Sequence, residues 1–210
     1  MRGRIFGVVC AFLVLTAAGC LSSRSDSVPA HTYRLSLDQD RAEVRPADIH
    51  GPILMVSPPL AEPGFETPRM VYVKRLYEVE YYAVNQWADT PARMVASLMA
   101  QALDRTGAWR AVVPLPGSIR GDFRLDSYGL VLRQEFMQDP SLVRVALRAQ
   151  LVDVKESRVV GTRAFEAVEN APSDDAYGGV LAANRAIAVL LEDIASWLRE
   201  CLKHSPECSR

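Results

Sequence analysis

The sequence predicts an α+β domain in which a mostly antiparallel sheet carries two helices packed on one of its faces. Several segments alternate apolar and polar residues with the period of a half-buried strand, most clearly at residues 143–151. Two other segments, residues 91–106 and the stretch after residue 175, repeat apolar residues every three or four positions. That spacing is typical of amphipathic helices that cover a sheet.

The composition is that of a globular protein with one core. The chain has 210 residues, of which 49% are hydrophobic and 23% charged, and its net charge is −1. This length accommodates a single domain and a targeting segment. The balanced charge, without a dense basic run, argues against a nucleic-acid partner.

The N-terminus predicts export and lipidation. Two arginines lie within the first four residues, and the apolar run at residues 5–18 is too short to span a bilayer, so residues 1–19 are expected to be a secretory signal peptide. The run ends in Ala18-Gly19-Cys20, which resembles a bacterial lipobox cleaved before Cys20, although Ala17 stands where Leu is usual. We therefore expect Cys20 to carry the acyl chains, palmitate among them. The alternative is an ordinary signal peptide with an incidental cysteine.

Residues 20–31 are expected to form the lipidated cysteine and a flexible tether. The segment is polar and rich in serine, without apolar periodicity. Leu21 follows the cysteine, and no Asp occupies the second position of the mature chain. The resemblance to lipoprotein sorting in Gram-negative bacteria then implies a lipid-anchored protein on the periplasmic face of the outer membrane.

The domain is expected at residues 32–200, and its first half predicts several strands. Gly64 and several prolines between residues 58 and 68 indicate an ordered surface loop around Phe65, which either packs over the sheet or touches a partner. Residues 74–76 predict the tight connection of a hairpin. The expected strands are residues 33–37, 53–56, 71–73 and 77–82.

A helix follows at residues 91–106. Thr90 is positioned to cap it with its hydroxyl, and Pro91 suits the first helical position because its missing N–H would be unpaired there anyway. Gly107 is expected to end the helix in a left-handed conformation. Residues 109–113 then predict a return strand.

The second half predicts a meander of strands and a final helix. The apolar phase of residues 123–136 switches near Gly129, which indicates a bulge. Turns are expected at residues 139–141 and 155–157, on either side of the strand at 143–151, and the next strand spans 159–168. Ser173, Asp174 and Asp175 suit the N-terminus of the last helix.

The cysteines have separate roles. Cys10 leaves with the signal peptide, and Cys20 is the predicted lipid site. Cys201 and Cys208 remain in the C-terminal tail at residues 201–210, an even pair in an oxidising compartment, and we expect a disulfide between them. Two cysteines are too few ligands for a structural zinc site.

We find no motif for catalysis, for a cofactor or for a metal, so an enzyme is not expected. His31, His50 and His204 are scattered and are expected at the surface. Asp174 and Asp175 resemble a carboxylate pair, but the start of a helix explains them.

Residues 69–94, the signature segment, contain three motifs in a fixed order: Arg69-Met70-Val71-Tyr72, Val79-Glu80-Tyr81-Tyr82-Ala83 and Trp87-Ala88-Asp89-Thr90-Pro91. They resemble the ABC-type transport auxiliary lipoprotein family, which has an Arg-hydrophobic-x-Tyr segment, then Leu-x-Tyr-Tyr-Ala, then Trp-Ala-x-x-Pro and a long helix. Val79 replaces the more usual Leu.

The resemblance implies a non-catalytic component of an intermembrane lipid transport system. Its partners would be an MCE-domain protein, the inner-membrane transport component and outer-membrane lipid. Apart from the resemblance, we expect the docking surface to be the loop around Phe65 with the neighbouring aromatic residues Tyr72, Tyr82 and Trp87. One alternative is a periplasmic module that binds phospholipid and carries or gates it. Another is a lipoprotein that activates a cell-wall enzyme by contact.

Overall fold

The computed structural model describes residues 29–37, 45–203 and 208, and these form a nine-stranded sheet with two helices. The predicted α+β class is confirmed. The sheet is mixed but mostly antiparallel, because its longest ladders, β7 with β8 and β8 with β9, are antiparallel. The strands are β1 His31–Tyr33, β2 Ile53–Val56, β3 Leu60–Ala61, β4 Arg69–Val73, β5 Glu80–Trp87, β6 Ala111–Pro114, β7 Phe123–Glu135, β8 Leu142–Asp153 and β9 Arg158–Asn170.

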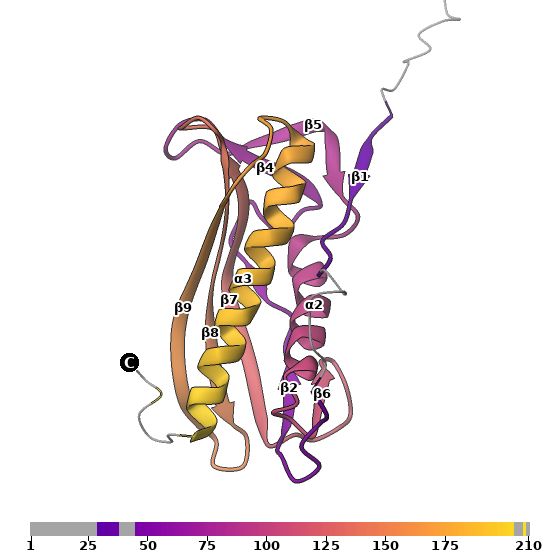
Figure 1. The fold of residues 1–210 in the computed structure, drawn as a ribbon, viewed down its shortest axis with the longest axis vertical. Coiled ribbons are helices and arrows are strands. Elements are labelled where there is room, and N and C mark those ends of the chain that lie inside the picture. Colours follow the sequence, from indigo (N-terminus) through magenta and orange to yellow (C-terminus); the bar gives the residue numbers. More distant parts are fainter. Residues whose placement is uncertain (1–28, 38–44, 204–207, 209–210) are drawn as a thin grey trace, which may run out of the picture.

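The long strand β7 is the centre of the sheet (Figure 1). One of its edges pairs with β8, which pairs in turn with β9. Its other edge pairs in succession with β2, β3 and β4, all in parallel. Strand β4 then pairs with β5, and β5 with β1, while β6 extends the sheet from β2. A single strand thus joins both ends of the elongated domain.

The predicted bulge in β7 is confirmed. The register with β8 shifts between Tyr128 and Val131, and Gly129 between them has φ +69°. An L-residue with a side chain rarely adopts this conformation, so glycine suits the position.

Helices α2 (Pro91–Arg105) and α3 (Ala176–Lys203) lie on the same face of the sheet and contact each other (Figure 1). Pro91 begins α2 as predicted, and Gly107 follows its end with φ +67°. The predicted hydroxyl cap is wrong: Thr90 makes no side-chain capping bond, and its own N–H instead donates to Asp89 Oδ1 at 2.7 Å. At the start of α3, Asp175 Oδ1 accepts from the Gly178 N–H at 2.7 Å.

Two predicted strands are displaced. The first strand is residues 31–33 rather than 33–37, since only these residues pair with β5. The second strand of the hairpin begins at Glu80, three residues later than predicted. Tyr77 adopts φ +66°, and the Arg75 carbonyl accepts from the Glu78 N–H, so residues 74–79 form a longer loop.

The helices bury one continuous apolar core against the sheet. Trp197, Ile187 and Leu191 of α3 and Met99 of α2 are at most 2% exposed in this core. Because α3 is 28 residues long, it covers β8 and β9 along their length (Figure 1). At its C-terminal end the structure places Cys201 and Cys208 with their Cα atoms 4.9 Å apart, a separation that a disulfide allows.

We expect replacement of both Cys201 and Cys208 by serine to lower the free energy of unfolding by up to about 2 kcal/mol, because a bond between them restrains the unfolded chain over a short loop. Urea unfolding measures this difference. A reducing agent should lower the stability of the natural sequence by a similar amount and leave the double variant unchanged. Equal stabilities before and after reduction would contradict the bond.

Candidate functional site

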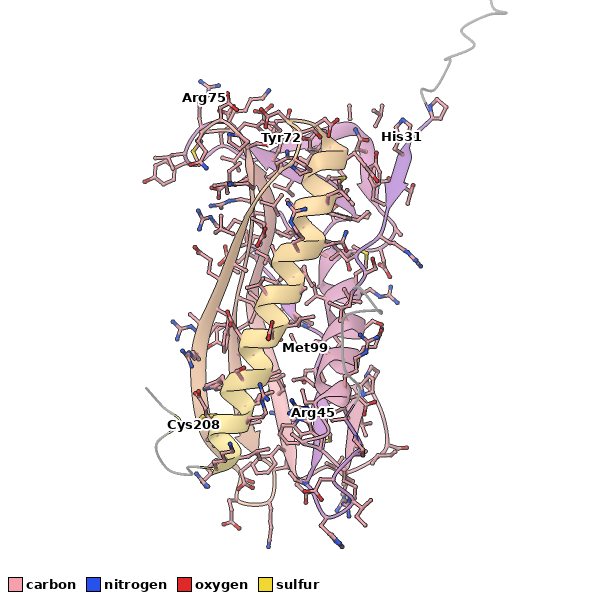
Figure 2. All side chains as sticks on the ribbon, in the orientation of Figure 1. His31, Arg45, Tyr72, Arg75, Met99 and Cys208 are labelled. Carbon is pink, nitrogen blue, oxygen red and sulfur yellow. A yellow bond between two sulfur atoms is a disulfide. The ribbon has the colours of Figure 1, made fainter. Side chains whose placement is uncertain are left out.

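The signature segment lies at one end of the molecule, where β4 and β5 meet the first turn of α3. Tyr72 marks this end in Figure 2. The predicted docking residues are divided there: Phe65 and Trp87 are buried, at 6% and 4% exposure, and Tyr72 and Tyr82 are half-buried. The rings of Tyr72 and Tyr82 lie 4.8 Å apart, whereas Phe65 belongs to a separate small cluster with Val71 and Val131. Their docking role stays a prediction.

Gln134 connects the elements that meet at this end. Its Oε1 accepts from the Tyr82 hydroxyl at 2.9 Å, and its Nε2 donates to Ser141 Oγ at 3.0 Å and to the Asp175 carbonyl at 3.2 Å. The Ser141 N–H in turn donates to Asp174 Oδ1 at 2.8 Å. One buried amide therefore joins β5, β7, the start of β8 and the start of α3. We call this group the Gln134 junction.

Gly179 gives the junction its space. A Cβ at this position would lie 2.3 Å from Gln134 Oε1, closer than real side-chain contacts allow. Two consecutive glycines in the first turn of a helix are unfavourable by propensity. Gly178 and Gly179 are therefore the sequence signal for a close approach, but the sequence does not identify Gln134 or Ser141 as the residues that approach.

Tyr82 of the junction and the neighbouring Tyr72 both have raised pKa values. A hydrogen bond from the Tyr72 hydroxyl to Glu80 Oε2, at 2.7 Å, and some burial raise the pKa of Tyr72. Burial, followed by the nearby Tyr72, raises the pKa of Tyr82 well above its ordinary range. In this structure both phenols are hydrogen-bond donors, and their rings contact each other.

Arg69 and Tyr81, two further residues of the signature segment, contact each other and the loop that carries Phe65. The Arg69 guanidinium lies over the Tyr81 ring, 4.2 Å from its centroid, and the Tyr81 hydroxyl donates to the Gly64 carbonyl at 3.0 Å. These contacts hold the loop that carries Phe65 against the sheet. Trp87 is fixed through its backbone, because its N–H donates to the Pro68 carbonyl at 2.7 Å.

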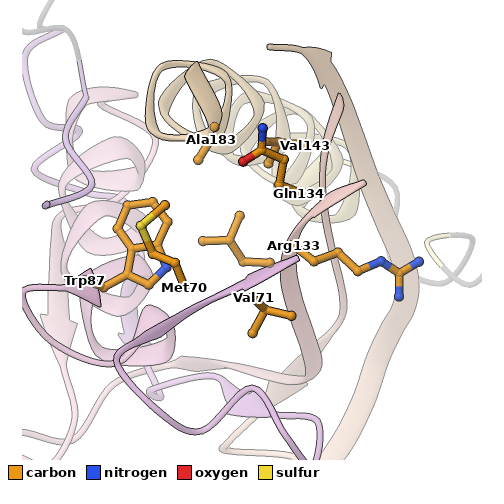
Figure 3. A pocket seen from close by; sticks show the side chains of 9 residues that line it. Met70, Val71, Trp87, Arg133, Gln134, Val143 and Ala183 are labelled. Atoms are coloured by element: carbon orange, nitrogen blue, oxygen red, sulfur yellow. The ribbon is translucent and has the colours of Figure 1, made fainter. Parts of the chain in front are cut away.

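Two hollows of the described structure are candidate binding sites, one beside the signature segment and one toward the C-terminal end of α3. Figure 3 shows a cavity of about 10 Å³, lined by Met70, Trp87, Gln134 and Ala183 among others, which is about the size of one water molecule. An open groove of about 370 Å³ runs between β9 and α3, with Arg163, Glu166, Asp193 and Glu200 in its walls. The cavity is apolar but too small for a lipid chain, and the groove is large enough but lined mainly by charged and polar side chains.

A row of charges crosses β7, β8 and β9. Glu135 accepts from both Arg133 and Arg144 at 2.8 Å, and Arg144 also pairs with Glu166. Burial alone would raise the pKa of Glu135, but the hydrogen bonds from the two arginines outweigh it and hold the pKa below its usual range. The row stabilises the strand pairing and contains no nucleophile.

The remaining predicted sites, the histidines and Cys20, lie at the surface or outside the described residues. His31 and His50 are exposed, while His204 and Cys20 lie outside the described residues. Within residues 29–37, 45–203 and 208, no three His, Cys, Asp or Glu side chains gather as a metal site would require. Neither described helix is apolar enough along its length to cross a membrane.

Comparisons with known proteins agree with this fold. The family model described as "ABC-type transport auxiliary lipoprotein component" matches residues 33–195. A crystal structure of a DUF330 protein from Xanthomonas campestris superposes with a TM-score of 0.73 at 21% identity, over 83% of this chain and 97% of that one. A crystal structure of an uncharacterized protein gives 0.62 at 14% identity, over 81% and 99%. No curated protein sequence matches the chain.

We expect Tyr82→Phe to lower the free energy of unfolding by about 1 kcal/mol, because it removes one buried hydrogen bond. Gly179→Ala should cost more, about 2–4 kcal/mol, because its methyl group displaces Gln134 from all of its partners. Thermal and urea unfolding measure both. Tyr177→Phe, at a ring that is 56% exposed, is the matched control and should be neutral. A neutral Gly179→Ala would show that the junction is not needed for stability.

The lowered pKa of Glu135 predicts a pH dependence. The carboxylate form is favoured in the folded state, so its contribution is fully present above the ordinary pKa of 4.5 and is lost as pH falls through the lower folded value. Glu135→Gln should therefore lower stability at neutral pH, by about 1–3 kcal/mol, and flatten its acid dependence. Glu156→Gln, at an exposed position, should change neither. If the stability of Glu135→Gln fell with decreasing pH as steeply as that of the natural sequence, the lowered pKa of Glu135 would not be the source of the pH dependence.

Proposed function

Because the chain belongs to the ABC-type transport auxiliary lipoprotein component family, it is an auxiliary lipoprotein of an ABC-type transport system, and we propose a finer role. Anchored through Cys20 to the periplasmic face of the outer membrane, it docks the MCE assembly of an intermembrane lipid transport system. The observation that carries this proposal is the family match at residues 33–195, which starts shortly after the lipobox-like Ala18-Gly19-Cys20.

The anchor suits a stationary docking protein. One acyl chain gives only marginal membrane binding, and each buried methylene adds about 0.8 kcal/mol, so several chains on Cys20 would hold the protein permanently. The polar residues after Cys20 would let the domain reach a partner without leaving the membrane.

The side chains of the signature segment support a docking role rather than catalysis. The Tyr82 hydroxyl donates a hydrogen bond to Gln134, and the Tyr72 hydroxyl donates one to Glu80. Because Phe65 and Trp87 are buried, we propose that they hold the backbone in place. The contact with the MCE assembly would then include the exposed neighbours of the four predicted residues, such as Glu66 and Ala83.

The second candidate, a phospholipid-binding module, receives less support. A lipid-binding site needs an apolar cavity of several hundred cubic ångströms. The cavity at Met70 and Trp87 has about 10 Å³, and the larger groove is lined mainly by charged and polar side chains.

Photo-crosslinking in intact cells tests the docking proposal. Photoreactive residues at Glu66 and Ala83 should give adducts to an MCE-domain protein, whereas one at Arg148, which is also exposed, should not. The photoreactive residues replace exposed side chains at all three positions, so they leave the core and the Gln134 junction intact.

The adducts distinguish the candidate functions. Adducts to phospholipid alone would favour the lipid-binding module, and adducts to a cell-wall synthase would favour an activator of that enzyme. Equal MCE adducts at all three positions would contradict a defined docking surface.

A further inference from the structure

Exposed apolar side chains gather at the tip of the β4–β5 hairpin. Leu76 is 69% exposed, Tyr77 fully exposed and Val79 44% exposed. Met137, also 44% exposed, lies in the loop after β7. The two loops are neighbours, because the Phe136 N–H donates to the Val73 carbonyl at 2.8 Å. We call these four residues the tip patch.

The tip patch is held in its exposed position. Tyr77 has φ +66°, which is rare for a bulky residue, and glycine or asparagine is the usual occupant of such a turn. The Arg75 side chain pairs with Glu78 at 2.7 Å across the turn. The Tyr77 ring is therefore exposed on a backbone conformation that is unfavourable for a bulky residue. Three other exposed apolar side chains lie in the same loop or in the loop bonded to it. Single exposed apolar residues need no explanation, but adjacent ones indicate a contact surface.

The patch lies at the end of the molecule from which the chain leads back to Cys20. Figure 2 shows His31, at the start of β1, and Arg75, in the hairpin loop, at the same end, whereas Arg45 and Cys208 lie at the other end. His31 lies eleven positions after Cys20. Even fully extended, these eleven steps span at most about 40 Å, so an acylated Cys20 keeps this end within about 40 Å of the membrane.

The charges around the patch favour apolar insertion over electrostatic attraction. Lys74 and Arg75 are matched by Glu80 and Glu78, with which they form ion pairs of 3.9 and 2.7 Å. Acidic residues stand on the neighbouring loops at this end, namely Asp139, Asp174 and Asp175. The loop thus has no excess of positive charge for anionic lipid. Tyrosine and leucine, however, partition well into the interface between headgroups and acyl chains.

We propose that the tip patch inserts into the headgroup region of the same lipid surface that holds the acyl chains. The proposal rests on the anchor at Cys20 put forward above. A second point of contact fixes the orientation of the domain, with the long axis of β7 and α3 standing away from the membrane. The partner of the tip patch is the lipid surface, because the anchor at Cys20 brings that surface within reach of this end of the domain.

Depth-dependent fluorescence quenching tests the insertion. The full-length acylated protein is placed in vesicles of phosphatidylethanolamine and phosphatidylglycerol, with an environment-sensitive fluorescent amino acid at position 77. A second sample carries the probe at Ile49, which is 73% exposed in the turn before β2, near the end opposite the patch. The probe at 77 should shift to shorter wavelength, lose several-fold of its quenching by aqueous iodide and be quenched by spin-labelled lipid. The probe at 49 should show none of these changes, and added salt should not reverse them at 77.

A variant excludes insertion driven by the probe itself. With the probe at Met137, the double substitution Leu76→Asp and Tyr77→Asp should restore iodide quenching, whereas Ile49→Asp should not. Equal iodide access at positions 77 and 49 in vesicle-bound protein would overturn the insertion while leaving the anchor intact. Shielding at 77 that requires an added partner protein would also overturn it. Failure of the wild-type chain to bind vesicles, with Cys20→Ala behaving identically, would overturn the anchor and the insertion together.

Discussion

The arrangement of this domain depends on the hydrogen bonds of one buried amide. Gln134 accepts a hydrogen bond from the Tyr82 hydroxyl of β5 and donates to Ser141 and to the backbone at the start of α3. Without these partners the amide would be buried at considerable cost, so sheet and helix must meet in one register. The absence of a side chain at Gly179 is what allows the helix to come so close. The Tyr-Tyr-Ala part of the signature thus has a structural reason: one tyrosine completes the junction and the other holds the loop of Phe65.

Much of the architecture could be predicted from the sequence, because periodicity reports which face of an element is buried. The strand β8, the bulge at Gly129 and helix α2 follow from such local patterns. The loop that connects the two strands of the hairpin was predicted too short. Tyr77 and Val79 continue the alternating pattern of β5, although both are exposed in the loop. The Gln134 junction could not be predicted. It joins residues 82, 134, 141 and 175, and no local pattern shows which distant polar groups pair.

The exposed and buried aromatic residues serve different parts of the proposed role. Trp87 and Phe65 lie in the interior, and their proposed role is to hold the backbone of this end in place. Tyr77, in contrast, is wholly in solvent, in the same hairpin loop as Arg75, which lies at the end of the molecule where His31 begins β1 (Figure 2). A protein that holds a large assembly at a membrane needs a defined orientation as well as attachment. A flexible polar tether alone provides attachment, and the orientation must come from the folded domain.

The pairing of β1 has a mechanical consequence. This strand joins the sheet through three residues in parallel with β5, and just beyond it Ser36 N–H is bound to Asn184 of α3 at 2.6 Å. If an assembly pulls on the domain while the acyl chains stay in the bilayer, the load enters at His31 and is carried first by this short ladder. The weakest link is then at the margin of the sheet, where pairing can be lost and regained without opening the core. Under such a load, β1 would therefore separate before the rest of the fold.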